Sequence, residues 1–82
     1  MVKLYALSTC PWCKKVKLLL DGKAIKYEAI DVDLAEGEVQ RQALAEVEKL
    51  TGKRAFPVTV IGETVIQGYK EEELERALEN EA

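Results

Sequence analysis

Two cysteines, Cys10 and Cys13, stand where a short apolar run gives way to a helical pattern, and they are the only cysteines in the chain. The run 2–7 is typical of a strand. Pro11 suits the first turn of a helix, because its φ is fixed and it lacks an N–H. Cys10 is therefore predicted to be the N-cap of that helix. A pair this close in sequence can close only a small ring, so no structural disulfide supports the fold.

A Cys-x-x-Cys step serves either thiol–disulfide exchange or one half of a zinc site. A closed structural zinc site takes four nitrogen or sulfur ligands, and the chain has no histidine and no second cysteine pair. A metal would have to be shared between chains. A third interpretation is a pair of inert buried thiols, which does not require Pro11-Trp12 between them. We favour exchange, and we predict no metal ligand and no cofactor.

The two thiols are predicted to differ in reactivity. A sulfur at an N-cap faces unsatisfied backbone N–H groups and the positive end of the helix dipole, and both favour thiolate over thiol. Cys10 is therefore the expected nucleophile. Cys13 falls in the first helical turn, further from solvent, and is expected to be the resolving thiol.

Length and charge limit the remaining possibilities. A chain of 82 residues forms one domain, 1–82, with one modest core. The net charge of -3 argues against nucleic acid as a partner, because phosphate contacts need a basic face. No signal peptide precedes Val2, and no apolar run approaches the ~18 residues of a membrane span. We expect a cytoplasmic monomer that binds neither nucleic acid nor membrane.

Hydrophobic spacing predicts strands over 2–7, 25–32, 58–61 and 64–66, and helices that begin at Pro11, after Asp33 and after Gly68. Gly22 is the expected left-handed cap of the first helix, and Asp33 the expected N-cap of the second. That second helix should bury an apolar stripe, which consists of Val39, Ala43, Val47 and Leu50.

The predicted order is β-α-β-α-β-β-α. The first two strands should be parallel, because a helix of about ten residues between them makes a right-handed crossover. The last two should form an antiparallel hairpin, since only Gly62-Glu63 separate them. The fold class is α/β, with a four-stranded mixed sheet flanked by three helices.

This arrangement resembles the thioredoxin fold and, within it, the glutaredoxin-like redoxins. The resemblance covers nearly the whole chain and rests on three matches. They are Cys10-Pro11-Trp12-Cys13 after the first strand, Phe56-Pro57 before the third, and Gly68 between the last strand and the last helix. It implies a dithiol–disulfide oxidoreductase, an electron carrier that reduces disulfide-containing protein substrates and is itself reduced by a reductase or a thiol donor.

The resemblance also implies a substrate-binding surface beside the dithiol. In the family the proline before the third strand is cis and packs against the cysteines, which leaves the backbone of the preceding residue free to pair with an extended substrate. We expect Trp12 to be exposed at the helix mouth. Arg54 could grip an acidic group, and the alternative for it is a solvated loop. The candidate substrate-binding residues are Pro11, Trp12, Arg54, Phe56, Pro57, Gly68 and Tyr69.

One departure from the family bears on the electron donor. Glutathione-using glutaredoxins follow the fourth strand with Gly-Gly, a variable residue and Asp, whereas this chain has Gln67-Gly68-Tyr69-Lys70. An ammonium thus replaces the carboxylate that holds the ligand's own ammonium. The Gly-aromatic step is similar to redoxins reduced by thioredoxin reductase, such as those that serve ribonucleotide reductase. We expect such a donor. The alternatives are a glutathione-dependent glutaredoxin and, in another class, a metal or iron–sulfur module that uses both cysteines in a dimer.

Overall fold

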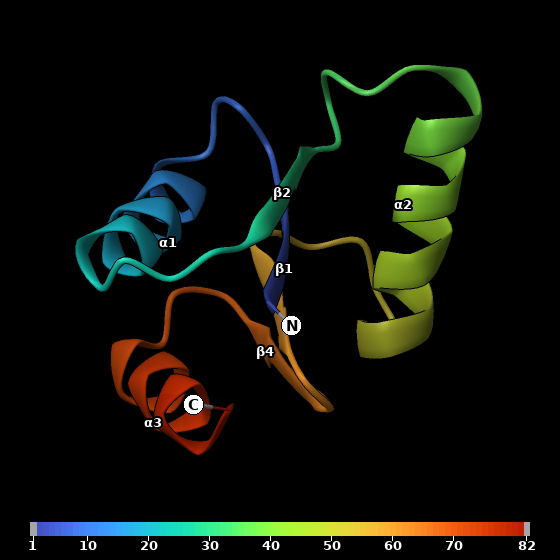
Figure 1. Cartoon of the computed structure of the whole chain (residues 1–82). Helices are drawn as coiled ribbons and strands as arrows, with labels where there is room; N and C mark the ends of the chain where they lie inside the picture. Colours follow the sequence, from blue (N-terminus) through green and yellow to red (C-terminus); the bar gives the residue numbers. More distant parts are fainter. Residues whose placement is uncertain (1, 82) are drawn as a thin grey trace.

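A four-stranded mixed sheet lies at the centre of the molecule, with α1 and α3 on one face and α2 on the other (Figure 1). The computed structural model describes residues 2–81; residues 1 and 82 of the predicted domain lie outside this range. The elements are β1 (Val2–Ala6), α1 (Pro11–Gly22), β2 (Glu28–Asp31), α2 (Gly37–Thr51), β3 (Val58–Ile61), β4 (Thr64–Gln67) and α3 (Glu71–Glu81). Their order is the predicted one. Within residues 2–81, no helix has the length and apolar character needed to cross a membrane.

The strand order is β2-β1-β3-β4. β1 pairs with β2 in parallel and with β3 antiparallel, so that Leu4 faces Ala29 on one side and Thr59 on the other. β3 and β4 form the predicted antiparallel hairpin. The first strand is therefore central, and its carboxyl end delivers the chain directly to the segment that holds both cysteines.

The core has two layers because side chains alternate across β1. Val2, Leu4 and Ala6 belong to a cluster that also holds Cys13 and the other buried residues of α1 and α3. Tyr5 belongs to a second cluster, with Ala43 and Val47 of α2. Burial of one large apolar side chain contributes about 1.5–3 kcal/mol of free energy, so the buried side chains of α1 hold this helix on the sheet.

The predicted cap of α1 is wrong by two residues. Gly22 is the last helical residue, and Ala24 takes the left-handed conformation, with φ 55°. Ile25 N–H donates to Leu20 O at 3.0 Å and Ala24 N–H to Asp21 O at 3.0 Å, which is the Schellman pattern with Ala24 at C′. Ile25 packs against the core, and this apolar contact fixes where the helix ends.

Two boundaries after α1 also differ from the prediction. β2 is shorter than 25–32, and α2 begins at Gly37, with Glu36 at the N-cap position and without a side-chain cap. The carboxylate of Asp33 does not cap α2 because it accepts hydrogen bonds from Ser8. Val39 was expected inside the apolar stripe but is 57% exposed; it lies in the first turn of α2, and the buried residues of this helix are Ala43 and Val47, further along.

The observed end of α1 makes a testable prediction about stability. Ala24→Gly should raise the free energy of unfolding by about 1 kcal/mol, because a left-handed conformation costs an L residue about that much. Gly22→Ala should raise it by about 0.5 kcal/mol, since Gly22 is helical and a new Cβ would meet no atom within 4 Å. Urea unfolding of the reduced protein measures both changes, and destabilisation by Ala24→Gly would contradict the assigned cap.

Candidate functional site

Cys10 occupies the predicted N-cap of α1, in an extended conformation with φ -85° and ψ 117°. Its Sγ accepts a hydrogen bond from the backbone N–H of Cys13 at 3.3 Å. Pro11 follows at the start of the helix, where its missing N–H costs nothing. One of the orphan N–H groups of the helix is thus satisfied by a sulfur atom, which is the arrangement that favours a thiolate.

The two thiols differ sharply in burial. Cys13 is fully buried in the cluster beneath α1, whereas Cys10 is partly exposed. Burial, together with the hydrogen bond to Cys10, raises the pKa of Cys13 to about 12, against smaller opposing effects of the Leu7 backbone and of Lys17. Cys13 therefore stays a neutral thiol at physiological pH.

The segment before β3 contains the proline predicted to be cis. The Phe56–Pro57 peptide bond is cis, which confirms what the resemblance implies. Pro57 O accepts a hydrogen bond from Gly68 N–H at 2.8 Å, so the residue after β4 is held against the residue before β3. Gly68 has φ +86°, and a Cβ there would meet nothing within 4 Å, so its glycine is required by conformation while the space above it is open.

Phe56 links both layers of the molecule. Its half-buried side chain packs against the cluster that contains Cys13 and also against the cluster under α2. Within residues 2–81 the Phe56 backbone makes no backbone–backbone hydrogen bond. Its side chain is thus anchored while its backbone is left unpaired.

Two aromatic rings flank the dithiol. Trp12 is 54% exposed, as predicted, and stacks on Tyr69 with ring centroids 6.2 Å apart and planes inclined at 26°. The Lys15 Nζ lies 4.5 Å from the centroid of Trp12 and 5.9 Å from that of Tyr69. Lys15 was not among the predicted site residues; its spacing of three from Trp12 was the available signal.

Two other basic residues near the site, Arg54 and Lys17, have partners elsewhere. Arg54 Nε donates to Glu48 Oε2 of α2 at 2.9 Å, and Lys17 Nζ lies 2.8 Å from Asp31 Oδ1. The structure therefore packs Phe56 and Tyr69 against the cluster that contains Cys13, joins Gly68 to Pro57 by a hydrogen bond, and shows Arg54 in an ion pair with α2. A role for Arg54 in substrate binding stays a prediction.

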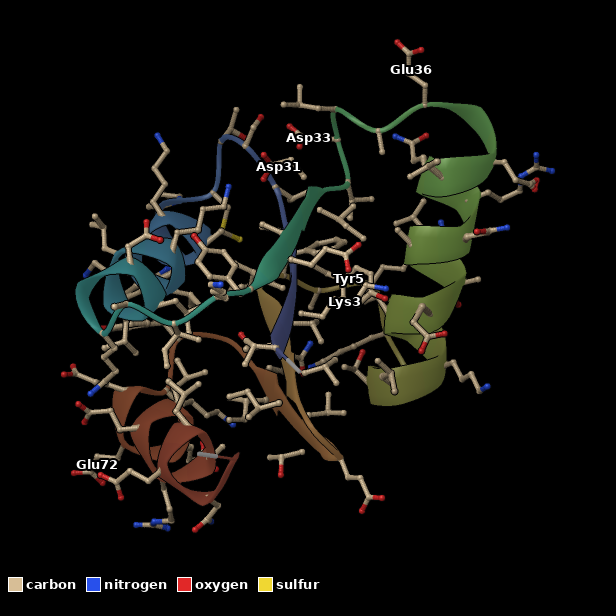
Figure 2. The ribbon with its side chains drawn as sticks, in the orientation of Figure 1. Lys3, Tyr5, Asp31, Asp33, Glu36 and Glu72 are labelled. Carbon is tan, nitrogen blue, oxygen red and sulfur yellow. The ribbon has the colours of Figure 1, made fainter. Side chains whose placement is uncertain are left out.

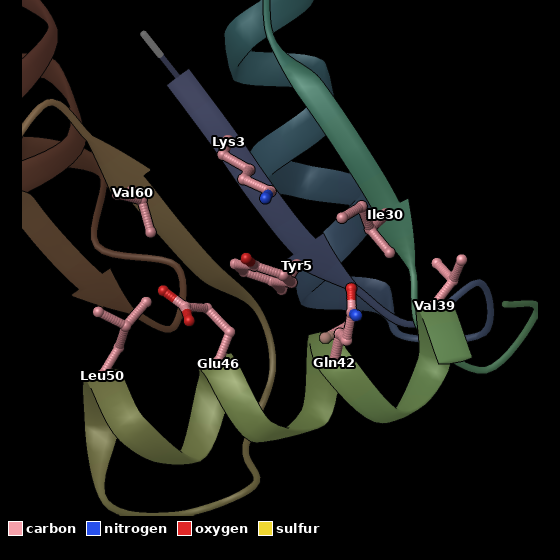
Figure 3. Close-up of a pocket in the computed structure, with 9 residues that line it drawn as sticks. Lys3, Tyr5, Ile30, Val39, Gln42, Glu46, Leu50 and Val60 are labelled. Carbon is pink, nitrogen blue, oxygen red and sulfur yellow. The ribbon is translucent and has the colours of Figure 1, made fainter. Parts of the chain in front are cut away.

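A hollow of about 430 Å³ lies on the opposite face of the sheet from α1, between the strands and α2 (Figure 3). Lys3, Tyr5 and Glu46 contribute to its walls, and none of the predicted site residues does. Across residues 2–81 there is also no cluster of three or more Cys, Asp or Glu side chains that could hold a metal ion. Of the two thiols, only that of Cys10 is partly exposed, at the start of α1.

Strand order, the cis proline and a dithiol at the N-terminus of α1 define a thioredoxin-fold redoxin. Similarity to known proteins narrows this class to one family. Residues 2–66 match the family model for glutaredoxin. A glutaredoxin-like 8.6 kDa protein in a rubredoxin operon of Clostridium pasteurianum is 34% identical, over 96% of this chain and 99% of the relative.

Solved structures of similar proteins support the same family. Methanoredoxin from Methanosarcina acetivorans has a TM-score of 0.89 at 38% identity, with 94% of this chain and 82% of that one covered. The glutaredoxin from Archaeoglobus fulgidus has a TM-score of 0.88 at 35% identity, with 94% and 84% covered. The chain belongs to the glutaredoxin family and is a thiol–disulfide oxidoreductase.

The burial of Cys13 makes a testable prediction about pH. The pKa of Cys13 is raised in the folded state. Between about pH 9 and about pH 12 the folded protein therefore still holds a proton that the unfolded chain has already lost. The reduced protein should therefore lose stability as pH rises through this window. Cys13→Ala keeps every other titrating group of the wild type, so its free energy of unfolding, measured with urea over this range, should fall less steeply with pH. Identical slopes of free energy against pH in the two proteins would contradict the assignment.

Proposed function

We propose that Cys10 is the nucleophile and Cys13 the resolving thiol in the reduction of disulfide substrates. The observation that supports this proposal is the difference in environment between two thiols that are three residues apart. Cys10 is accessible and accepts a helix N–H, whereas Cys13 is buried and has a pKa of about 12. One thiol is thereby prepared to attack and the other is kept in reserve.

In the first step the Cys10 thiolate attacks one sulfur of the substrate disulfide. A Cys10–substrate disulfide forms, the substrate S–S bond breaks, and the other substrate sulfur leaves as a thiolate that takes a proton from solvent. Cys13 does not compete in this step, because it is neutral and has no exposed surface.

In the second step Cys13 loses its proton and attacks the sulfur of Cys10. The intramolecular disulfide forms, the mixed disulfide breaks, and the second substrate sulfur leaves as a thiol, so that two electrons have passed to the substrate. The negative charge of a Cys10 thiolate is one cause of the raised pKa of Cys13. Once Cys10 is in the mixed disulfide this repulsion is gone, which favours deprotonation of Cys13 at the right moment.

We propose that the surface around the dithiol binds the substrate chain. The unpaired backbone of Phe56 and the open space above Gly68 suit an extended segment that approaches by its main chain. Trp12 and Tyr69 offer it an exposed aromatic flank. An open surface around Gly68 and the exposed Trp12 suits a protein disulfide better than a small molecule that must be enclosed.

For the electron donor we propose a thioredoxin-reductase-type flavoenzyme or another dithiol in preference to glutathione. Tyr69 stacks on Trp12, and the next residue is Lys70, where glutathione-using relatives place the carboxylate. Glu71 is the nearest substitute carboxylate, but its Oε2 accepts the Tyr69 hydroxyl at 3.3 Å. Lys70 Nζ lies 3.7 Å from Glu73 Oε2, an exposed pair that only weakly offsets its charge.

We also propose that the protein is a single-domain cytoplasmic monomer. An accessible dithiol is maintained in a reducing compartment. Stoichiometric zinc or the colour of an iron–sulfur cluster in the purified protein would instead support the metal-binding alternative.

The cysteine roles predict opposite outcomes for two serine variants. Cys10→Ser should abolish disulfide reductase activity, whereas Cys13→Ser should accumulate a mixed disulfide that it cannot resolve. Mass spectrometry after incubation with a small disulfide measures both. An adduct on Cys13 in Cys10→Ser that forms as fast as the wild-type adduct on Cys10 would overturn the assignment.

The donor preference predicts the effect of a charge change. Lys70→Asp should speed reduction by glutathione about two- to fivefold, the size expected of one exposed charge, and leave reduction by a thioredoxin reductase within twofold. Lys26→Asp, a matched change in the exposed segment before β2, should alter neither rate. Trp12 fluorescence follows the reaction, and efficient, saturable reduction of the wild-type protein by glutathione would show that Lys70 does not exclude this donor.

A further inference from the structure

Ser8 and Asp33 form a two-point contact between the loop that carries Cys10 and the loop after β2. The Ser8 backbone N–H donates to Asp33 Oδ1 at 2.9 Å, and the Ser8 hydroxyl donates to Asp33 Oδ2 at 2.5 Å. The residues are 25 positions apart in sequence. Figure 2 shows Asp33 at the end of β2, toward the loop that precedes α1. Hydrogen bonds to an ionised carboxylate are about twice as strong as neutral ones.

Ser8 belongs to the turn that presents Cys10. Cys10 N–H donates to Leu7 O at 3.1 Å, which closes a turn of four residues with Ser8 as its second member. The turn leads straight into α1, whose Cys13 N–H reaches back to Cys10 Sγ. A contact that fixes Ser8 therefore fixes the direction from which the Cys10 sulfur meets the helix.

The other half of the contact is itself firmly held. Val32 N–H donates to Ala6 O at 2.8 Å, so the pairing of β1 and β2 continues up to the residue before Asp33. Leu34 N–H and Ala35 N–H both donate to Asp31 O, at 3.0 and 3.1 Å, and close a turn around Asp33. The Ser8 contacts hold the pKa of Asp33 below its ordinary value, so the carboxylate is ionised at neutral pH.

We propose that Asp33 is a positioning residue for the dithiol, which acts through Ser8 to hold the Cys10 turn and so sets the reduction potential of the Cys10–Cys13 pair. This inference rests on the proposed function, because it requires those two thiols to be the redox couple. The N–H contact to Cys10 Sγ stabilises the reduced state, above all its thiolate. In the oxidised state the S–S bond itself fixes Cys10 relative to Cys13, so loss of the Asp33 contact costs the oxidised form less.

The direction of the effect follows. Without the contact the reduced state loses stability relative to the disulfide, and the pair becomes harder to reduce. In Asp33→Ala the equilibrium constant for reduction should fall about three- to tenfold, the range expected for a weakened N-cap. For a two-electron couple this corresponds to a potential lower by about 15 to 30 mV.

The experiment equilibrates each variant with dithiothreitol and its cyclic disulfide. One dithiothreitol gives two electrons and two protons to the protein disulfide and becomes the ring, so the fraction of reduced protein gives the potential. Glu36→Ala is the matched control, since Glu36 is an exposed carboxylate of the same loop that makes no side-chain cap contact. Its potential should equal that of the wild type.

Two further variants separate position from charge and guard against a folding defect. Asp33→Asn keeps an acceptor for the Ser8 N–H and should stay within about twofold of the wild type. Ser8→Ala removes only the hydroxyl bond and should lower the equilibrium constant about two- to threefold. In Asp33→Ala the Cys13 amide of the reduced protein should also exchange with solvent faster.

An unchanged potential in Asp33→Ala and Ser8→Ala, with thermal stability lowered equally in both redox states, would overturn the proposal and leave the contact a purely structural one. So would a full shift in Asp33→Asn. A wild-type protein with no two-electron thiol couple would instead refute the proposed function, a result that is distinguishable because it precedes any comparison of variants.

Discussion

Packing of the inner stripe of α1 against β1 is the interaction on which the site depends. Cys13, Val16 and Leu20 are fully buried on that stripe, so the helix cannot rotate without exposing them. Because Cys13 is one of the three, core packing and site geometry are set together. The start of the same helix places Cys10 at its cap, where the Cys13 N–H is within hydrogen-bonding distance. A hydrophobic contact thus positions the proposed nucleophile.

The structure gives two identical side chains different chemistry over three residues. Burial of Cys13, more than a nearby charge, accounts for the difference, and Lys17 is paired with Asp31 while the chain has no histidine. The cap position offers Cys10 an N–H donor, and burial denies Cys13 water. A chain of 82 residues can therefore build a dithiol centre from one strand–helix junction.

Much of this could be predicted from the sequence, and the exceptions share a physical cause. The order of the elements, the Cys10 cap and the exposure of Trp12 follow from local patterns and from the family resemblance. The misplaced caps at Gly22 and Asp33 arose because tertiary contacts outweighed local preference. Ile25 docks in the core and moves the left-handed residue to Ala24, while Ser8 engages the carboxylate of Asp33. No spacing rule reveals a partner 25 residues away.

Phe56 has a consequence for how such a protein evolves. Its side chain is committed to both core layers, while the recognition proposed for it uses only the main chain. Main-chain recognition does not depend on the side chain that is attached. Apolar replacements of Phe56 would therefore change the thermal stability of the protein without changing which partners it binds. Changes in selectivity for partners must then come from substitutions at peripheral positions such as Trp12 and Tyr69. One redoxin can in this way serve many clients, and duplicated copies can specialise without rebuilding the centre.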